Sequence, residues 1–191
     1  MAPLMSAAAV LAMMLDTDPK IELVAHRSTF EASAETIAKV SADTPVIMGA
    51  DGVARTEALL VSLFFHEASL KPDAAGDCEK EKTDPKTGMC LPGGTPRSFC
   101  GFQINESNFA MLKTTKGEIQ SDFEVCTRSA ITMLRASFAI CRGRPQEELL
   151  GNYAFGRGTC GGPKGEGLGK SRTRVFFAKR LLARSIARGD Q

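Results

Sequence analysis

The chain of 191 residues contains no tryptophan, a single tyrosine and two histidines. It also lacks any apolar run near the roughly 20 residues that a membrane-spanning helix requires, which argues against a helical membrane span. His26 and His66 are too few for a metal site built from several imidazoles, and no Cys-x-x-Cys pair is present to suggest zinc. We therefore expect no metal site.

The composition is that of a globular protein with a core of its own. Hydrophobic residues make up 43% of the chain and charged residues 24%. The charge is unevenly distributed: residues 1–100 carry 9 basic and 14 acidic side chains, whereas residues 101–191 carry 15 and 8. The basic half suits an anionic polymer such as nucleic acid or cell-wall material, and it equally suits plain solubility.

Six cysteines stand at positions 78, 90, 100, 126, 141 and 160. The even number favours disulfides and therefore an oxidising compartment, with free thiols in a cytosolic protein as the alternative. Cys126 and Cys141 lie on one predicted helix, about 22 Å apart along its axis. Bridged Cα atoms lie within about 7 Å of each other. We therefore expect each of these two cysteines to pair with one at 78, 90, 100 or 160.

Helical patterns dominate the chain. They predict helices over 4–15, 30–41, 54–67, 119–142, 145–154 and 170–188. Residues 71–99 are rich in proline and glycine and predict a long loop, and the 71–105 region alone gives a strand signal. The apolar N-terminus has no positively charged start, which favours a helix of the fold over a signal peptide. We expect a mainly α fold with an N-terminal helical segment, 1–50, and a main domain, 51–191.

One carboxylate has an unusual position on its predicted helix. Leu60, Leu63, Phe64 and Glu67 follow an i, i+3, i+4, i+7 spacing, which places Glu67 on the apolar face. Burial disfavours the charged form and raises the pKa of a carboxyl, and the C-terminal end of a helix acts in the same direction. A protonated glutamic acid near neutral pH is what general acid catalysis needs. The alternative is a side chain that turns to solvent or pairs with Lys71.

Three segments extend this interpretation. They are His66-Glu67-Ala68-Ser69-Leu70-Lys71-Pro72, Ser98-Phe99-Cys100-Gly101-Phe102-Gln103-Ile104-Asn105 and Asn152-Tyr153-Ala154-Phe155-Gly156. In this order and spacing they resemble the motifs of the lysozyme-like lytic transglycosylases, above all the small periplasmic members that serve secretion systems, conjugation machines and phage. The resemblance covers residues 54–185. It implies an α+β lysozyme-like fold: a helical bundle around a substrate cleft, with a disulfide-stapled loop or a small β-hairpin.

The resemblance also implies roles for single residues. Glu67 would be the single acid/base, which protonates the glycosidic oxygen between N-acetylmuramic acid and N-acetylglucosamine. It would then deprotonate the C6 hydroxyl of the same muramic acid, which closes a 1,6-anhydro ring. Gln103 would contact the substrate and Tyr153 would orient the acid or the sugar. The remaining expected substrate-binding residues are Ser69, Phe102, Ile104 and Asn105. No cofactor is implied.

The three segments depart from the family pattern at several positions. Ala68 stands where a serine is expected, with Ser69 one residue later. Cys100 occupies the glycine position of the second motif, with Gly101 shifted by one, and Ala154 replaces the asparagine after the tyrosine. These departures bear on rate and product type more than on fold.

Hydrolysis is the close alternative to lytic cleavage. Most glycoside hydrolases use two carboxylates about 5–9.5 Å apart. Asp73, Asp77 and Asp84, together with Glu79, follow Glu67 in the long loop and are the candidates for a second carboxylate, as in a goose-type lysozyme. Acidic residues in such a loop equally serve turns and solvation.

Two further functions differ in class from an enzyme. A non-catalytic peptidoglycan-binding protein of a secretion or phage machine would explain the motif departures. The second and weaker option is a disulfide-stapled basic module that binds nucleic acid. The seven basic residues of 170–188 also suit an anionic cell wall or a solvated helix face, and no nucleic-acid-binding motif accompanies them. We expect peptidoglycan glycan strands as the partner, no nucleic acid, and a periplasmic or extracellular location in the cell envelope.

Overall fold

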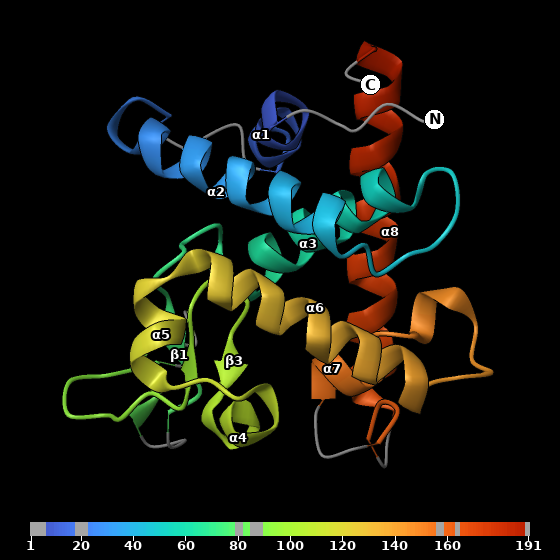
Figure 1. Ribbon diagram of the computed structural model, residues 1–191. Helices are drawn as coiled ribbons and strands as arrows, with labels where there is room; N and C mark the ends of the chain where they lie inside the picture. Colours follow the sequence, from blue (N-terminus) through green and yellow to red (C-terminus); the bar gives the residue numbers. More distant parts are fainter. Residues whose placement is uncertain are drawn as a thin grey trace.

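The computed structural model describes residues 7–17, 23–78, 82–84, 90–155, 159–162 and 165–189, which form a mainly helical structure with a small sheet (Figure 1). The helices in these ranges are α1 (Ala7–Leu15), α2 (Leu23–Asp43), α3 (Gly52–Ala68), α4 (Phe109–Leu112), α5 (Lys116–Ser121), α6 (Phe123–Ile140), α7 (Gly151–Phe155) and α8 (Glu166–Arg188). Short 3-10 turns are η2 (Glu106–Asn108) and η3 (Gln146–Glu148). None of the helices described is long and apolar enough to cross a membrane.

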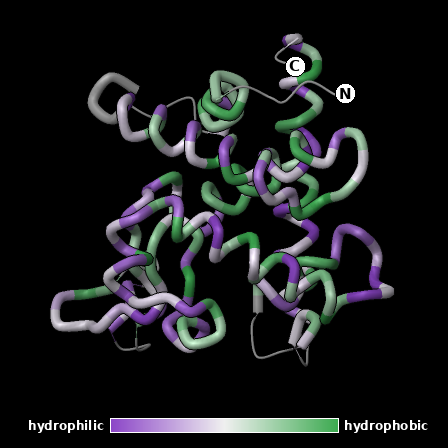
Figure 2. Tube along the Cα trace, in the orientation of Figure 1, coloured by the Kyte–Doolittle hydropathy of each residue, from purple (hydrophilic) through white to green (hydrophobic). Residues whose placement is uncertain are grey.

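Helix α3 packs against α1, α2 and above all α8. The sheet with α4 and α5 lies at one end of α6, and α7 lies at its other end, beside α8 (Figure 1). The trace is most hydrophobic along α1 and α3, while the loop after α6 is hydrophilic (Figure 2). Val10 of α1, Ile37 of α2 and Leu60 of α3 belong to one buried cluster. The boundary expected at residue 50 falls in the turn before α3.

The strand signal of the 71–105 region corresponds to a three-stranded antiparallel sheet. Its strands are β1 (Ala75–Gly76), β2 (Ser98–Phe99) and β3 (Ile104–Asn105), in the order β1-β2-β3. Ala75 pairs with Phe99, and Phe99 pairs with Ile104. Each strand has two residues, so the sheet serves to bring the loop after α3 next to the turn that contains Gln103.

The helix predicted over 119–142 is divided in two. Thr115 and Glu118 form a reciprocal capping box that starts α5 at Lys116. Asp122 ends this helix with extended backbone, and its Oδ1 accepts hydrogen bonds from the amides of Glu124 and Val125 at 2.8 and 3.1 Å. A single aspartate therefore closes α5 and begins α6.

The helix predicted over 145–154 is also interrupted. Residues 146–148 form the 3-10 turn η3, and α7 begins only at Gly151. Side chains of the neighbouring helices supply the hydrogen bonds at the break: Ser137 donates to the Leu149 carbonyl at 2.8 Å, and Ser171 accepts from the Leu150 amide at 3.0 Å. Tertiary contacts thus override the local helical preference.

The other helix predictions agree with the structure apart from their ends. Helix α2 begins seven residues before the predicted 30–41 segment, at Leu23, and α8 begins four residues before the predicted 170–188 segment, at Glu166. Helix α1 lies within the predicted 4–15 segment, of which residues 4–6 lie outside the described residues.

All six cysteines form disulfides. Their Cα atoms are 5.6 Å apart in Cys78–Cys90, 6.4 Å in Cys100–Cys126 and 5.1 Å in Cys141–Cys160. This confirms that Cys126 and Cys141, at the two ends of α6, each bond to a cysteine of another segment. Cys78–Cys90 closes the long loop on itself, whereas the other two disulfides attach loops to α6.

Candidate active site

Glu67 lies in the last turn of α3, where the helix closes in a left-handed turn. Ser69 and Leu70 have φ values of 50° and 60°, and the Leu70 amide donates to the Phe64 carbonyl at 3.2 Å. The predicted apolar face is buried, because Leu63 and Phe64 have no exposed surface. Ser69, an expected substrate contact, is exposed at the cap position.

The carboxylate of Glu67 forms an ion pair with Arg174 of α8. Its Oε1 lies 2.5 Å from Nη2 of Arg174, and the two side chains are only 18% and 9% exposed. The carboxylate therefore has a cationic partner, which is Arg174 rather than the Lys71 considered from the sequence. Both charges sit between α3 and α8, where little water screens them.

Opposing effects act on the proton affinity of Glu67. Burial raises the pKa of its carboxyl and is the largest effect; Arg174 and Lys170 lower it, and Asp77 raises it. The net direction is upward. This agrees with the direction expected for a general acid, although a neighbouring cation opposes the shift.

Tyr153 of α7 links this region to the second motif. Its hydroxyl donates a hydrogen bond to the Phe102 carbonyl at 2.8 Å. Burial raises the pKa of the Tyr153 phenol well above its usual range, and the charge of Glu67 raises it further. Tyr153 therefore remains a neutral phenol that lies within electrostatic reach of Glu67.

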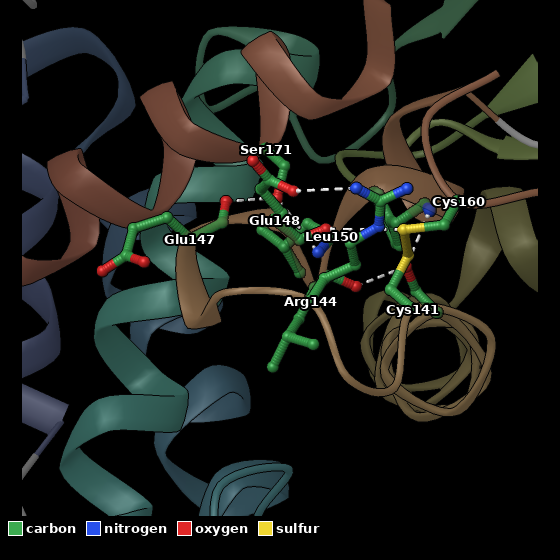
Figure 3. Close-up of a disulfide and its surroundings, with 10 residues drawn as sticks. Cys141, Arg144, Glu147, Glu148, Leu150, Cys160 and Ser171 are labelled. Carbon is green, nitrogen blue, oxygen red and sulfur yellow. Dashed lines mark hydrogen bonds and ion pairs between the residues drawn. A yellow bond between two sulfur atoms is a disulfide. The ribbon is translucent and has the colours of Figure 1, made fainter. Parts of the chain in front are cut away.

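A disulfide and a serine hold the segment that carries Tyr153. Cys141–Cys160 bridges the end of α6 to the loop before α8, and the Cys160 sulfur lies 3.9 Å from the Glu148 carbonyl, two residues before Leu150 (Figure 3). On the other side of this segment, Ser171 of α8 accepts a hydrogen bond from the Leu150 amide at 3.0 Å (Figure 3). These attachments to α6 and α8 determine where α7 presents its tyrosine.

The turn that contains Gln103 has left-handed backbone at two residues and a close backbone approach at Gly101. Cys100, at the family's glycine position, has a φ of 62°, and Gln103 has a φ of 50°. A Cβ on Gly101 would lie 2.3 Å from Cε2 of Phe64, so only glycine fits there. The Cys100 carbonyl accepts from both the amide and the Nε2 of Gln103, at 3.0 and 3.1 Å. The glycine shift thus lets this turn pack against α3.

The structure brings the remaining second-motif residues together without exposing all of them. Phe102 and Ile104 are only 1% and 0% exposed. Both side chains pack in the core. They therefore offer no exposed surface with which to line a cleft, the role that was expected of them. Asn105 caps η2, since its Oδ1 accepts from the Ser107 amide at 3.1 Å. Gln103, in contrast, is partly exposed, and its Oε1 lies over Gly76.

Among the acidic candidates, Asp77 is the one whose charge acts on Glu67. Asn105 donates to Ser98 Oγ at 3.2 Å, and Ser98 in turn donates to Asp77 Oδ2. This chain of hydrogen bonds orients the Asp77 carboxylate, which contributes to the raised pKa of Glu67. Asp73 lies exposed in the turn after α3, Asp84 lies in the disulfide-closed loop, and Glu79 lies outside the described residues.

Sequence reasoning missed Arg174, which it counted among the basic residues of the C-terminal helix. The buried positions of α8 include a regular stripe with alternating spacings of three and four residues: Ser171, Arg174, Ala178, Leu181 and Ser185. An arginine in a stripe of small and apolar residues indicates a buried cation that needs an anionic partner. This signal could have identified Arg174 as a buried cation from the sequence, although not its partner.

The predicted cleft does not coincide with the apolar pocket between α3, α6 and α8. This pocket has a volume of about 260 Å³, and Met48, Leu59 and Val175 are among the residues that line it. None of the expected site residues borders it. The substrate cleft thus stays a prediction.

In the part of the chain that the structure describes, no group of three or more His, Cys, Asp or Glu side chains is arranged to hold a metal ion. Comparisons with models of protein families, with curated proteins and with solved structures found no match. The case for a function therefore depends on the site itself.

Proposed function

We propose that this protein cleaves the β-1,4 bond between N-acetylmuramic acid and N-acetylglucosamine in peptidoglycan, as a lytic transglycosylase. The observation that carries this proposal is the convergence of three segments far apart in the chain. Glu67 of α3 acts electrostatically on Tyr153 of α7, and Tyr153 bonds to the carbonyl of the residue before Gln103. These are the residues on which the family resemblance rests.

The proposed reaction needs one carboxyl group that first donates a proton and then accepts one. Protonated Glu67 gives its proton to the glycosidic oxygen, which leaves with the electron pair of its bond to C1 of muramic acid. The C6 hydroxyl of the same sugar then attacks C1 and returns a proton to Glu67. The raised pKa of Glu67 favours the protonated starting state. No cofactor takes part in this scheme.

Hydrolysis is the second candidate function, and the position of Asp77 favours it. The Asn105–Ser98–Asp77 hydrogen bonds hold this carboxylate on the sheet, where it acts on Glu67 electrostatically. A second carboxylate so placed could hold a water molecule for attack at C1. The product would then be a reducing sugar rather than an anhydro sugar.

The disulfides support a location in an oxidising compartment, which we propose to be the periplasm or the exterior of the cell envelope. Glycan strands would be the partner there, with secretion, conjugation or phage machinery as the assembly served. A non-catalytic peptidoglycan-binding role in such a machine is the remaining alternative, given Ala68, Cys100 and Ala154.

Mass spectrometry of the products from purified peptidoglycan tests the proposal. We expect wild-type protein to release muropeptides lighter by one water than hydrolysis products, and the E67Q variant to release them at least about 10²-fold more slowly. Products with ordinary reducing ends would instead support a lysozyme, and the D77N variant would then be examined. Folded wild-type protein that binds glycan strands without cleaving them would favour the binding role.

Removing the Cys100–Cys126 disulfide should disturb the Gln103 turn. We expect the double variant C100S/C126S to lose about 3 kcal/mol of stability, because 26 residues separate the two cysteines and the unfolded chain gains freedom. We also expect glycan cleavage to fall, because the disulfide fixes to α6 the Cys100 carbonyl that accepts hydrogen bonds from both the amide and the side chain of Gln103. Urea denaturation and turnover assays measure the two effects.

The matched control is C78S/C90S, which opens the loop but leaves the Gln103 turn attached to α6. We expect a loss of stability with a smaller loss of activity. Equal losses of activity in both double variants would contradict a specific role for Cys100, as would full activity of reduced protein whose thiols are shown to be free.

A further inference from the structure

Arg174 is fixed in position by more than its contact with Glu67. Its backbone carbonyl accepts a hydrogen bond from Ser62 Oγ of α3 at 2.7 Å, in the buried interface of the two helices. The residue as a whole is 8% exposed. Its Nε is buried and has no hydrogen-bond partner among the described residues. The guanidinium therefore cannot turn to solvent without leaving a packed interface.

In this arrangement the charge of Arg174 acts mainly on Glu67. A guanidinium keeps its charge at any ordinary pH, so the buried cation is permanent. The contact that the structure gives its charged group is with Glu67. When Glu67 is ionised the pair is balanced, and when Glu67 takes up a proton the cation is left without a counter-charge.

We propose that Arg174 is a positioning residue that holds the Glu67 carboxylate in one orientation beside Tyr153 and stabilises the anion formed when its proton leaves. This inference rests on the proposed function. In the first step the proton passes to the glycosidic oxygen as the C1–O bond breaks, and negative charge appears on Glu67 next to Arg174. The same contact resists the return of the proton from the C6 hydroxyl, so Arg174 sets the balance between the two steps.

The other charged and titratable groups near this pair are less well placed to stabilise the Glu67 anion. Lys170 lies one turn before Arg174 on α8 and also lowers the pKa of Glu67, but it is exposed and therefore screened by water. Asp77 acts in the opposite direction, and Tyr153 stays neutral. Burial, followed by the charges of Arg174 and Arg180, lowers the pKa of His66 and so favours its neutral form.

The test compares R174M and R174K with R184M, a variant of an exposed arginine on the same helix. Carbon-13 NMR follows the Glu67 carboxyl, identified by its loss in E67Q, and turnover is measured over the same pH range. We expect R174M to titrate Glu67 at higher pH, to move the high-pH limit of activity upward, and to lower kcat at least about tenfold with little change in KM. R174K should restore the titration and part of kcat, and R184M should match wild type.

Each outcome decides between the inference and the proposed function. An unchanged Glu67 titration in R174M, or an unchanged kcat, would overturn the role of Arg174. If R174M does not fold, R174K tests the positioning role, because lysine keeps the charge and lacks the planar fork; an unchanged kcat in R174K would overturn that role. A Glu67 titration that moves as expected in a protein whose wild type cleaves nothing would overturn the proposed function while supporting the electrostatic contact.

Discussion

Replacing Glu67 with glutamine is expected to lower the rate of peptidoglycan cleavage by about 10²- to 10⁴-fold, the usual contribution of a general acid or base. The amide has nearly the same shape and can still accept a hydrogen bond from Arg174, but it carries no proton to donate. Substrate binding should survive, because the neutral side chain changes the shape of the site little. Turnover and glycan-strand binding, measured on the same preparation, separate the two effects.

The charge of Arg174 complicates this experiment and suggests its control. Removing one partner of a buried ion pair can cost about 3–5 kcal/mol, because the other charge is left uncompensated. The double variant E67Q/R174M removes both charges and should recover part of that stability while remaining inactive. E35Q, a change at an exposed acid of α2, should behave as wild type. Activity retained by folded E67Q would refute the assignment of the acid.

Much of the surroundings of Glu67 could be predicted because short-range rules govern them. The spacing of Leu60, Leu63 and Phe64 determines a buried helix face, and the residue at the next position must share it. The length of α6 likewise separates Cys126 from Cys141 whatever the rest of the chain does. These predictions were confirmed because each depends on geometry within a single element.

The parts that could not be predicted depend on contacts between elements. The pairing of Glu67 with Arg174 joins residues 107 positions apart, and no local pattern states which acid the buried cation of α8 meets. The break before α7 has the same origin, because Ser171 of α8 supplies a hydrogen bond that a continuous helix would have made internally. Burial of Phe102 also follows from packing against α3 and α6, where its ring lies 5.6 Å from Phe64 and 5.7 Å from Phe123, centroid to centroid.

The second large effect is expected at Glu57, a buried carboxyl in the middle of α3 outside the candidate site. It has no exposed surface, and neither of its carboxyl oxygens has a hydrogen-bond partner in the described structure. Burial raises the pKa of Glu57 from 4.5 to about 8. Between these two values the folded protein holds a proton that the unfolded chain has lost, so stability falls as pH rises through this range and levels off above about 8.

We expect E57Q to remove this loss, because glutamine does not titrate. Near pH 5 the variant should resemble wild type, whose Glu57 is then protonated. At about pH 9 it should be more stable by about 4 kcal/mol, or roughly 10 °C in melting temperature. Denaturation of E57Q, wild type and the exposed-site control E35Q at both pH values measures the difference. If wild type and E57Q lost stability in parallel between the two pH values, Glu57 would be ionised in the folded protein and would have to hold its charge with a partner inside the core.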